Sequence, residues 1–366
     1  MTKFEALERR THQPNWEGLL NTILRKGTPD RVYHIELFQD PEIQAAIVER
    51  FDLAKGFNPI DPHFDEKKYI AVQRFCGFDY VRARPVNLDW TFRNLNASDE
   101  SSTLARDGGR NFMDEHHGPI TTWEEFEAYP WPDPFKDECY RDFDWFQENL
   151  PDDMCIIAQG NIGHFAEHIC WLPGYETFCY MLFDQRDLLE AIARKLEDIF
   201  RVVVQRTLEY SRVKMVWASD DMGFKTGLMM SADDIRSLVL RGHKELAAMS
   251  HAAGRPYLLH ACGKLTDIYE DLIKDVKIDA KHSFEDTIED VRDVKRTYGS
   301  RLTLLGGIDV DFLCRRSPED IRRRVRETLD ACQPGGGYCL GTGNSVANYI
   351  PLENYLAMVD EGMKWK

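Results

Sequence analysis

Short apolar runs alternate with longer amphipathic stretches along most of the chain, and this alternation predicts strands separated by helices. The runs are too short for helices, and they are bounded by breakers, as Pro256 and Gly263 bound the run PYLLHACG. Eight runs fit this description: residues 31–37, 80–85, 155–160, 215–221, 257–263, 278–284, 302–309 and 337–345. A helix between two strands serves as a crossover connection, which carries the chain back to the end where the first strand began. Strands joined in this way run parallel.

The helical stretches carry their own start signals. Ser231 precedes Asp234 as in a capping box, and Ser317-Pro318 followed by two acids marks a second helix start. Eight strands alternating with helices predict an α/β fold of the (β/α)8 TIM-barrel type. A doubly wound open sheet is the alternative, but no GxGxxG motif follows the first run, which disfavours a nucleotide-binding version of it.

Two stretches fall outside the alternation. Residues 1–30 predict an N-terminal helical extension, with Trp16, Leu19 and Ile23 at helical spacing. Residues 86–154, after the second strand, show no strong periodicity, and we expect an insertion or lid there, with a small hairpin around Gly108 and Gly118. The expected organisation is therefore one barrel domain over residues 1–366.

Composition narrows the possible partners. A net charge of −16 argues against nucleic acid and against an anionic membrane surface as general partners. No stretch approaches the length of an apolar membrane span, and the first residues lack the apolar core of a signal peptide. Nine scattered cysteines without an export signal indicate reduced thiols, so we expect a cytoplasmic protein. A homodimer is the common default for such an enzyme.

In a barrel, catalytic and binding residues collect where strands end. Nearly every predicted strand end here is polar, which core packing does not require. Each residue also has a structural interpretation; adjacent acids, for example, commonly cap helices. The candidates are His34 and Glu36, Arg82 and Arg84, Asn161 and His164, Asp220 and Asp221, His260 and Cys262, His282, Asp309, and Asn344.

The fifth run carries the most specific pair. Residues two apart on a strand face the same side, so His260 and Cys262 should face the same way. An imidazole and a thiolate together are typical zinc ligands. An isolated HxC is also compatible with a core cysteine beside a hydrogen-bonded histidine, because zinc sites normally use three or four protein ligands.

The second half of the chain resembles the uroporphyrinogen decarboxylase superfamily, which includes corrinoid-dependent methyltransferases and related demethylases. The resemblance rests on these segments: DDMG (220–223), HACG (260–263), LLGGIDV (304–310), SPEDIRRRV (317–325) and GGGYCLGTGNSVANYIPLENYLAMVDEG (335–362). It implies the barrel fold independently of the strand count.

The methyltransferase branch implies zinc held by the His and Cys of the HxC motif and by a second cysteine in the glycine-rich loop of the last strand. His260 and Cys262 match this pattern, but Asn344 occupies the position of the second cysteine, and Cys339 has the opposite parity. Three residues could supply a further ligand: Asp221, Glu36 or His282.

The resemblance implies two enzymatic functions. In the first, corrinoid-linked methyl transfer or demethylation of a small molecule, His260 and Cys262 hold a metal, a partner protein carries the corrinoid, and Asp220 or Asp221 positions or protonates the leaving group. In the second, a metal-free decarboxylase, Asp221 stabilises the cationic intermediate and His260 or His282 donates the proton. The arginine-rich stretch that grips porphyrinogen carboxylates is missing at residues 32–38.

We favour the methyltransferase, with the decarboxylase second and a non-catalytic binding barrel third. The catalytic set is then Asp220, Asp221, His260 and His282. The substrate-binding set is His34, Glu36, Arg84, Asn161, Asp309 and Asn344.

Overall fold

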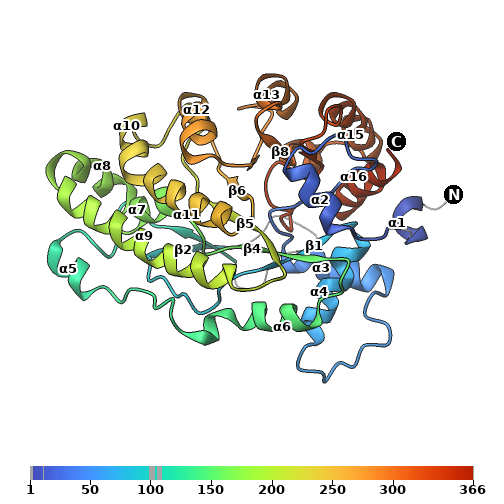
Figure 1. The fold of residues 1–366 in the computed structure, drawn as a ribbon, viewed down its shortest axis with the longest axis horizontal. Coiled ribbons are helices and arrows are strands. Elements are labelled where there is room, and N and C mark those ends of the chain that lie inside the picture. Colours follow the sequence, from blue (N-terminus) through green and yellow to red (C-terminus); the bar gives the residue numbers. More distant parts are fainter. Residues whose placement is uncertain (1–2, 11, 99–103, 105–108, 366) are drawn as a thin grey trace.

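Seven of the eight predicted strands pair side by side in one parallel sheet, in the order β1-β4-β5-β6-β7-β8-β9. The computed structural model describes residues 3–10, 12–98, 104 and 109–365. Helices surround the curled sheet (Figure 1), so the α/β barrel predicted from the alternation is confirmed. The strands are β1 (Tyr80–Ala83), β4 (Cys155–Gln159), β5 (Val213–Ser219), β6 (Tyr257–His260), β7 (Ala280–His282), β8 (Thr303–Leu305) and β9 (Tyr338–Cys339).

The predicted first strand, residues 31–37, closes the barrel without forming a regular ladder. It makes a single parallel bridge, between His34 and Leu340. On its other side the hydroxyl of Tyr80 accepts from the backbone N–H of Glu36 at 2.9 Å and donates to its carbonyl at 3.1 Å. A side-chain hydroxyl thus takes the place of a neighbouring backbone, which explains why an extended segment is present but no strand.

The helices lie between the strands along the chain, as the alternation predicted. The N-terminal extension contains α1 (Glu5–Arg9) and α2 (Trp16–Ile23). Both predicted helix starts are confirmed, because the side chain of Ser231 accepts from Asp234 N and that of Ser317 from Asp320 N. The remaining long helices are α3 (Pro41–Phe51), α4 (Phe64–Phe75), α6 (Arg141–Asn149), α8 (Tyr175–Asp184), α9 (Arg186–Leu208), α11 (Arg241–Ala252), α13 (Val291–Tyr298), α15 (Pro318–Cys332) and α16 (Leu352–Lys364).

Shorter helical segments occupy the loops between strands and long helices. The α-helical ones are α5 (Trp123–Ala128), α7 (Phe165–Trp171), α10 (Ala232–Asp234), α12 (Tyr269–Asp271) and α14 (Val310–Arg315). Two 3₁₀ segments, η1 (Asp137–Tyr140) and η3 (Thr266–Ile268), and two π-helical segments, η2 (Ile235–Leu240) and η4 (Leu272–Val276), complete the set.

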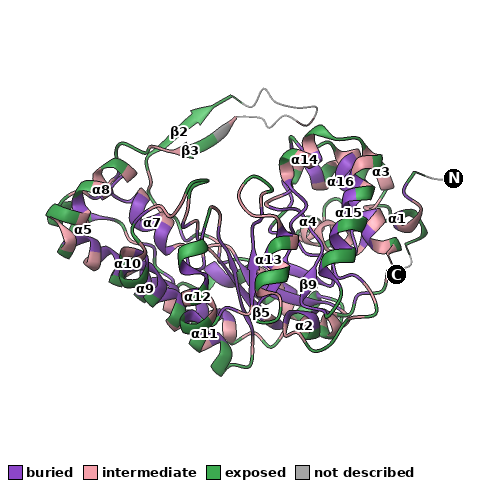
Figure 2. Ribbon diagram, turned by 90° about the horizontal axis from the view of Figure 1, so that it is seen from above, coloured by how far each residue is buried: buried purple, intermediate pink, exposed green. Residues whose placement is uncertain are grey.

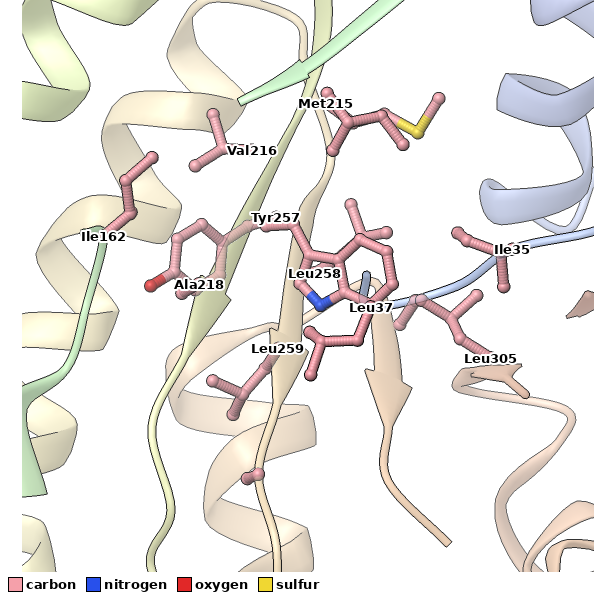
Figure 3. Packing of buried hydrophobic residues seen from close by; sticks show 14 of the residues in the cluster. Ile35, Leu37, Ile162, Met215, Val216, Ala218, Tyr257, Leu258, Leu259 and Leu305 are labelled. Carbon is pink, nitrogen blue, oxygen red and sulfur yellow. The ribbon is translucent and has the colours of Figure 1, made fainter. Parts of the chain in front are cut away.

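The strands are buried on both faces, as expected for a parallel sheet covered by helices. Figure 3 shows the buried cluster in which Met215, Leu258 and Leu305 from three strands pack with Ile35 and Leu37. The segment that lacks a regular ladder therefore still contributes to the apolar core.

The stretch 86–154 holds more regular structure than its composition predicted. Strands β2 (Asn94–Ala97) and β3 (Arg110–Met113) form an antiparallel hairpin, and α6 leads directly into β4. Of the two glycines expected at a hairpin, Gly108 lies outside the described residues and Gly118 follows the hairpin, where its N–H donates to Pro173 O at 3.0 Å.

The β2–β3 hairpin extends as an arm across the barrel, from the side of α8 toward α14 (Figure 2). On the far side, the amide of Asn348 donates to the carbonyl of Leu104 at 2.7 Å, and Leu104 belongs to the connection between β2 and β3. The arm therefore contacts the loop that follows the last strand.

The nine cysteines, all in the described part of the chain, are free thiols. Among the described helices, none is both long and apolar enough to cross a membrane.

Candidate metal and catalytic site

A cavity of about 670 Å³ lies where the strands end. Its wall includes residues from the ends of β4, β5 and β6 and from the loops after β1 and β9. Seven of the candidates at the strand ends line it: Arg82, Arg84, His164, Asp221, His260, Cys262 and Asn344. The chemistry expected at the carboxyl ends of the strands is thus gathered in one place.

Three potential metal ligands converge on the wall of this cavity. Ligand atoms of Asp221, His260 and Cys262 all lie within 4.8 Å of one another. His260 Nε2 is 3.4 Å from Cys262 Sγ and 3.5 Å from Asp221 Oδ1. The expectation that His260 and Cys262 face the same side is confirmed, and Asp221 joins them because β5 and β6 are neighbours.

The orientation of this cluster is set by backbone and second-layer hydrogen bonds. The N–H of Cys262 donates to Asp221 Oδ1 at 2.9 Å, which holds the carboxylate beside the imidazole. The Nδ1 atoms of His260 and His282 are 2.8 Å apart, and His282 Nε2 lies 3.2 Å from the carbonyl of Thr342. Because the carbonyl can only accept, His282 carries its proton on Nε2 and its Nδ1 accepts from His260. The remaining nitrogen of His260, Nε2, is the one that faces the cluster.

Electrostatics agree with this arrangement. Burial alone would lower the pKa of His260, but negative charge on Cys262 and Asp221 raises that pKa to about 10. Burial would likewise raise the pKa of Asp221, yet the hydrogen bond and charge of His260 bring it below its usual range. Burial and the charge of His260 hold the pKa of His282 far below its ordinary value, so His282 stays neutral. Without a metal, a proton on His260 Nε2 is therefore held between a sulfur and a carboxylate.

That proton occupies the place a cation would take, and the donor set of imidazole, thiolate and carboxylate is one that zinc accepts. The residues present therefore fit a zinc ion. Of the three candidates for a further ligand, Asp221 lies in the cluster. His282 orients His260 from behind. The carboxylate of Glu36 instead accepts from the backbone N–H and the hydroxyl of Thr342.

The sulfur of Cys262 has two further polar neighbours. Asn344 Nδ2 approaches it at 3.5 Å and Ser283 Oγ at 3.4 Å. The position where the resemblance implies a second cysteine is thus adjacent to Cys262, but it supplies an amide. Cys339 is fully buried in β9 and is not among the residues that line the cavity.

Ser283 adopts a backbone conformation that is unusual for a residue with a side chain. Its φ is 88°, and the buried ammonium of Lys281 donates to its carbonyl at 2.7 Å. Strained backbone of this kind persists only where surrounding contacts impose it, and it clusters at functional sites. Lys281 therefore helps to present the Ser283 hydroxyl to the sulfur.

Asp220, predicted to be catalytic, points away from the cavity. Its carboxylate is fully buried and accepts from the backbone N–H groups of Ala166 and Glu167 at 2.9 and 3.0 Å. His243 Nε2 lies 2.8 Å from the same carboxylate. Asp220 therefore anchors the N-terminus of α7, while its neighbour Asp221 faces the cluster.

Four residues predicted to bind substrate also lie elsewhere than on the cavity wall. Asp309 caps α14 by accepting from Phe312 N at 2.8 Å. Asn161 donates to the carbonyl of Pro85 at 3.0 Å. His34 and Glu36 do share a face, but the side chain of His34 packs against Gly362 of α16, outside the barrel. Glu36 is buried, accepts from the N–H and hydroxyl of Thr342, and is not among the residues that line the cavity.

The cavity also contains polar groups outside the predicted catalytic, substrate-binding and metal sets, although His164 was among the candidates at the strand ends. Gln159 at the end of β4 lines it, and within the described residues its buried Oε1 has no hydrogen-bond partner. His164 and Glu167 line it as well, with 2.5 Å between Nδ1 and Oε2. The i,i+3 spacing of His164 and Glu167 at a helix start was a usable signal for this pair.

Two arginines lie at one end of the cavity. The guanidinium of Arg82 donates to the carbonyl of Leu37 and lies 5.4 Å from the ring centroid of Phe38. Arg84 is exposed, and its side chain packs beside Gly160. The guanidinium of Arg82 thus binds the segment that follows residue 36, whereas that of Arg84 is exposed at the cavity.

A solved structure supports the fold. A methyltransferase from Methanosarcina mazei has a similar structure, with a TM-score of 0.66 and 17% sequence identity over 95% of this chain and 97% of that one. A weaker similarity, with a TM-score of 0.46 that is too low to support a shared fold, is to a putative vitamin-B12 independent methionine synthase from Listeria monocytogenes, with 13% identity over 92% of this chain and 97% of the other. No curated protein sequence matches the chain.

The sequence pattern of one family matches much of the chain directly. The family model described as uroporphyrinogen decarboxylase (URO-D) matches residues 117–365, which span β4 to β9 and the whole ligand cluster. The chain therefore belongs to the uroporphyrinogen decarboxylase family.

Proposed function

We propose that this protein is a methyltransferase that transfers a methyl group between a small molecule in the cavity and a corrinoid carried by a partner protein. The observation that carries the proposal is the convergence of Asp221, His260 and Cys262 within 4.8 Å on the cavity wall. A decarboxylase has no need of a thiol beside an imidazole and a carboxylate. A metal-dependent methyltransferase does.

His260 Nε2, Cys262 Sγ and one oxygen of Asp221 would hold the metal, for which zinc is the candidate. The chemistry that zinc supplies when bound is Lewis acidity, which lowers the pKa of a thiol or hydroxyl group at neutral pH. His282 keeps the correct nitrogen of His260 turned toward the cluster, and Asn344 and Ser283 direct hydrogen bonds at the sulfur. Three protein ligands leave a position for substrate, as is usual for catalytic zinc.

A second function, decarboxylation without a metal, is supported by a different observation. The exposed guanidinium of Arg84 lines the cavity that also holds Asp221, and guanidinium groups are the preferred partners of carboxylates. The segment 32–38 weakens the hypothesis that the decarboxylated substrate is a porphyrinogen, because it supplies a buried Glu36 rather than arginines.

Metal content decides between the two functions. We expect about one zinc per chain in protein purified without oxygen, and loss of that zinc in Cys262→Ser. Cys314→Ser, which alters a half-buried thiol on α14, serves as the matched control and should keep its zinc. Absence of zinc from the wild type after reconstitution would overturn the methyltransferase proposal. Decarboxylation of carboxylated substrates, abolished in Arg84→Ala, would then be the expected activity.

A further inference from the structure

His164 and Glu167 form a charged pair on the cavity wall that the metal cluster does not use. His164 is the residue before α7 and Glu167 lies in its first turn, with Nδ1 and Oε2 2.5 Å apart. Their side chains are only 20% and 13% exposed. Because Glu167 occupies Nδ1, the nitrogen left for a molecule in the cavity is Nε2.

The pair is held from behind by a buried network. Asp220 binds the N–H groups of Ala166 and Glu167, and His243 in turn binds Asp220. The chain reaches this position through Gly163, whose φ is 73° and where a Cβ would lie 2.8 Å from the Cβ of Ala218. The ring of His164 stacks on His168 at 5.4 Å between centroids. A surface pair needs no such support, so the arrangement argues for a function that depends on position.

The charges around His164 favour its protonated form. Burial lowers the pKa of His164, but Glu167, Asp220 and Asp221 together raise it above its ordinary value. His168, which faces it across the stack, is kept neutral because burial holds its pKa far below the ordinary value. The surrounding carboxylates thus favour a proton on His164 Nε2, with Nδ1 bonded to Glu167.

We propose that His164, oriented by Glu167, is the proton donor of the active site and that the substrate is a methyl ether. This inference rests on the proposed methyl transfer and adds a direction and a substrate class to it. The bond between the methyl carbon and the ether oxygen breaks, and oxygen keeps the electron pair and takes the proton from His164 Nε2. The methyl carbon receives its new electron pair from a nucleophile, for which the reduced corrinoid of the partner is the candidate. Solvent then returns a proton to His164.

The chemistry of the leaving atom selects the substrate class. An alkoxide or phenoxide is a basic leaving group, so its departure benefits from a proton donor. A thiolate is far less basic, and an amine leaving a quaternary ammonium is neutral, so neither needs this proton. A buried proton donor in the same cavity as the ligand cluster therefore favours an oxygen leaving atom.

Two ethers that differ only in leaving-group basicity test the assignment. The zinc-loaded enzyme is given free cob(I)alamin as methyl acceptor, with methoxybenzene or 4-nitromethoxybenzene as donor, and methylcobalamin is followed by absorbance. We expect His164→Gln to slow methoxybenzene by about 100-fold or more, as for loss of general acid catalysis, and 4-nitromethoxybenzene by less than about tenfold. A structural role for the pair would slow both ethers alike and would overturn the proposal, as would the absence of transfer from either ether by zinc-loaded wild type.

A matched surface pair and a titration complete the test. His116→Gln disrupts the His116–Glu176 pair, which has the same chemistry at 2.8 Å but is largely exposed, and it should leave both rates unchanged. In metal-free protein, NMR should show His164 titrating above 6.5 and shifting downward in Glu167→Gln. Titration of His164 at or below 6.5 would overturn the assignment. If zinc is bound and lost in Cys262→Ser while these results fail, the proton-donor assignment falls and the metal site stands.

Discussion

His260 and His282 are register partners on the neighbouring strands β6 and β7, and their Nδ1 atoms lie 2.8 Å apart. A neutral His282 that donates to Thr342 can only accept from His260, which leaves Nε2 of His260 for the ligand cluster. The two histidines therefore have different roles, with His260 in the cluster and His282 as its orienting partner.

Replacing His282 should weaken metal binding without touching a ligand. In His282→Leu the Nδ1 proton of His260 loses its acceptor, and we expect zinc affinity to fall by about 10- to 100-fold, as is typical of outer-layer partners. His282→Gln offers both an acceptor and a donor and should recover much of the affinity. Competition with a chromogenic chelator measures both variants; equal affinities in Leu and Gln variants would contradict the orienting role.

Adjacent acids should give opposite phenotypes. Asp220→Asn disturbs a carboxylate that accepts from two backbone N–H groups at the start of α7 and from His243. It should lower the free energy of unfolding by roughly 1–3 kcal/mol and leave zinc content unchanged. Asp221→Asn should behave the other way, because its side chain is 39% exposed and belongs to the cluster. We expect at least about a tenfold loss of zinc affinity, equivalent to about 1.4 kcal/mol, with little change in stability. Chemical denaturation measures the stability of both variants, and metal analysis with chelator competition measures their zinc binding.

Asn344→Cys should strengthen the metal site. Asn344 Nδ2 lies 3.5 Å from the sulfur of Cys262, so a thiol at this position would add a soft ligand next to the existing three. We expect zinc affinity to rise by about tenfold or more, which corresponds to about 1.4 kcal/mol. Asn344→Ser, which supplies no thiolate, is the control and should not show the gain in the same chelator competition.

Buried Glu36 should make stability fall as pH rises. Burial raises the pKa of Glu36 to about 8, although its hydrogen bonds with Thr342 act in the opposite direction. Between the ordinary value of about 4.3 and 8, the unfolded chain releases this proton and the folded chain keeps it, so stability falls by up to about 1.4 kcal/mol per pH unit. Glu36→Gln carries no such proton, and its stability relative to wild type should rise from pH 5 to pH 8 in urea denaturation. A constant difference would show that Glu36 is ionised when folded.

Local pattern was sufficient to predict much of the fold and the centre of the site. Seven strands, the helix starts at Ser231 and Ser317, and the common orientation of His260 and Cys262 follow from periodicity and capping chemistry, which act over a few residues. Residues 31–37 were expected to form a strand and made only one bridge, because a tyrosine side chain replaced the neighbouring backbone.

The sequence by itself determined which residues could carry the chemistry, namely a set of acids, histidines and a cysteine at the ends of parallel strands. Only the tertiary structure decided which of them meet. Asp220 and Asp221 are neighbours in the chain, yet one anchors a helix and the other faces the cavity. His164 precedes α7 and His260 ends β6, yet they line the same cavity. The physical reason is that side-chain direction near a strand end depends on packing between elements far apart in sequence, which no local spacing encodes.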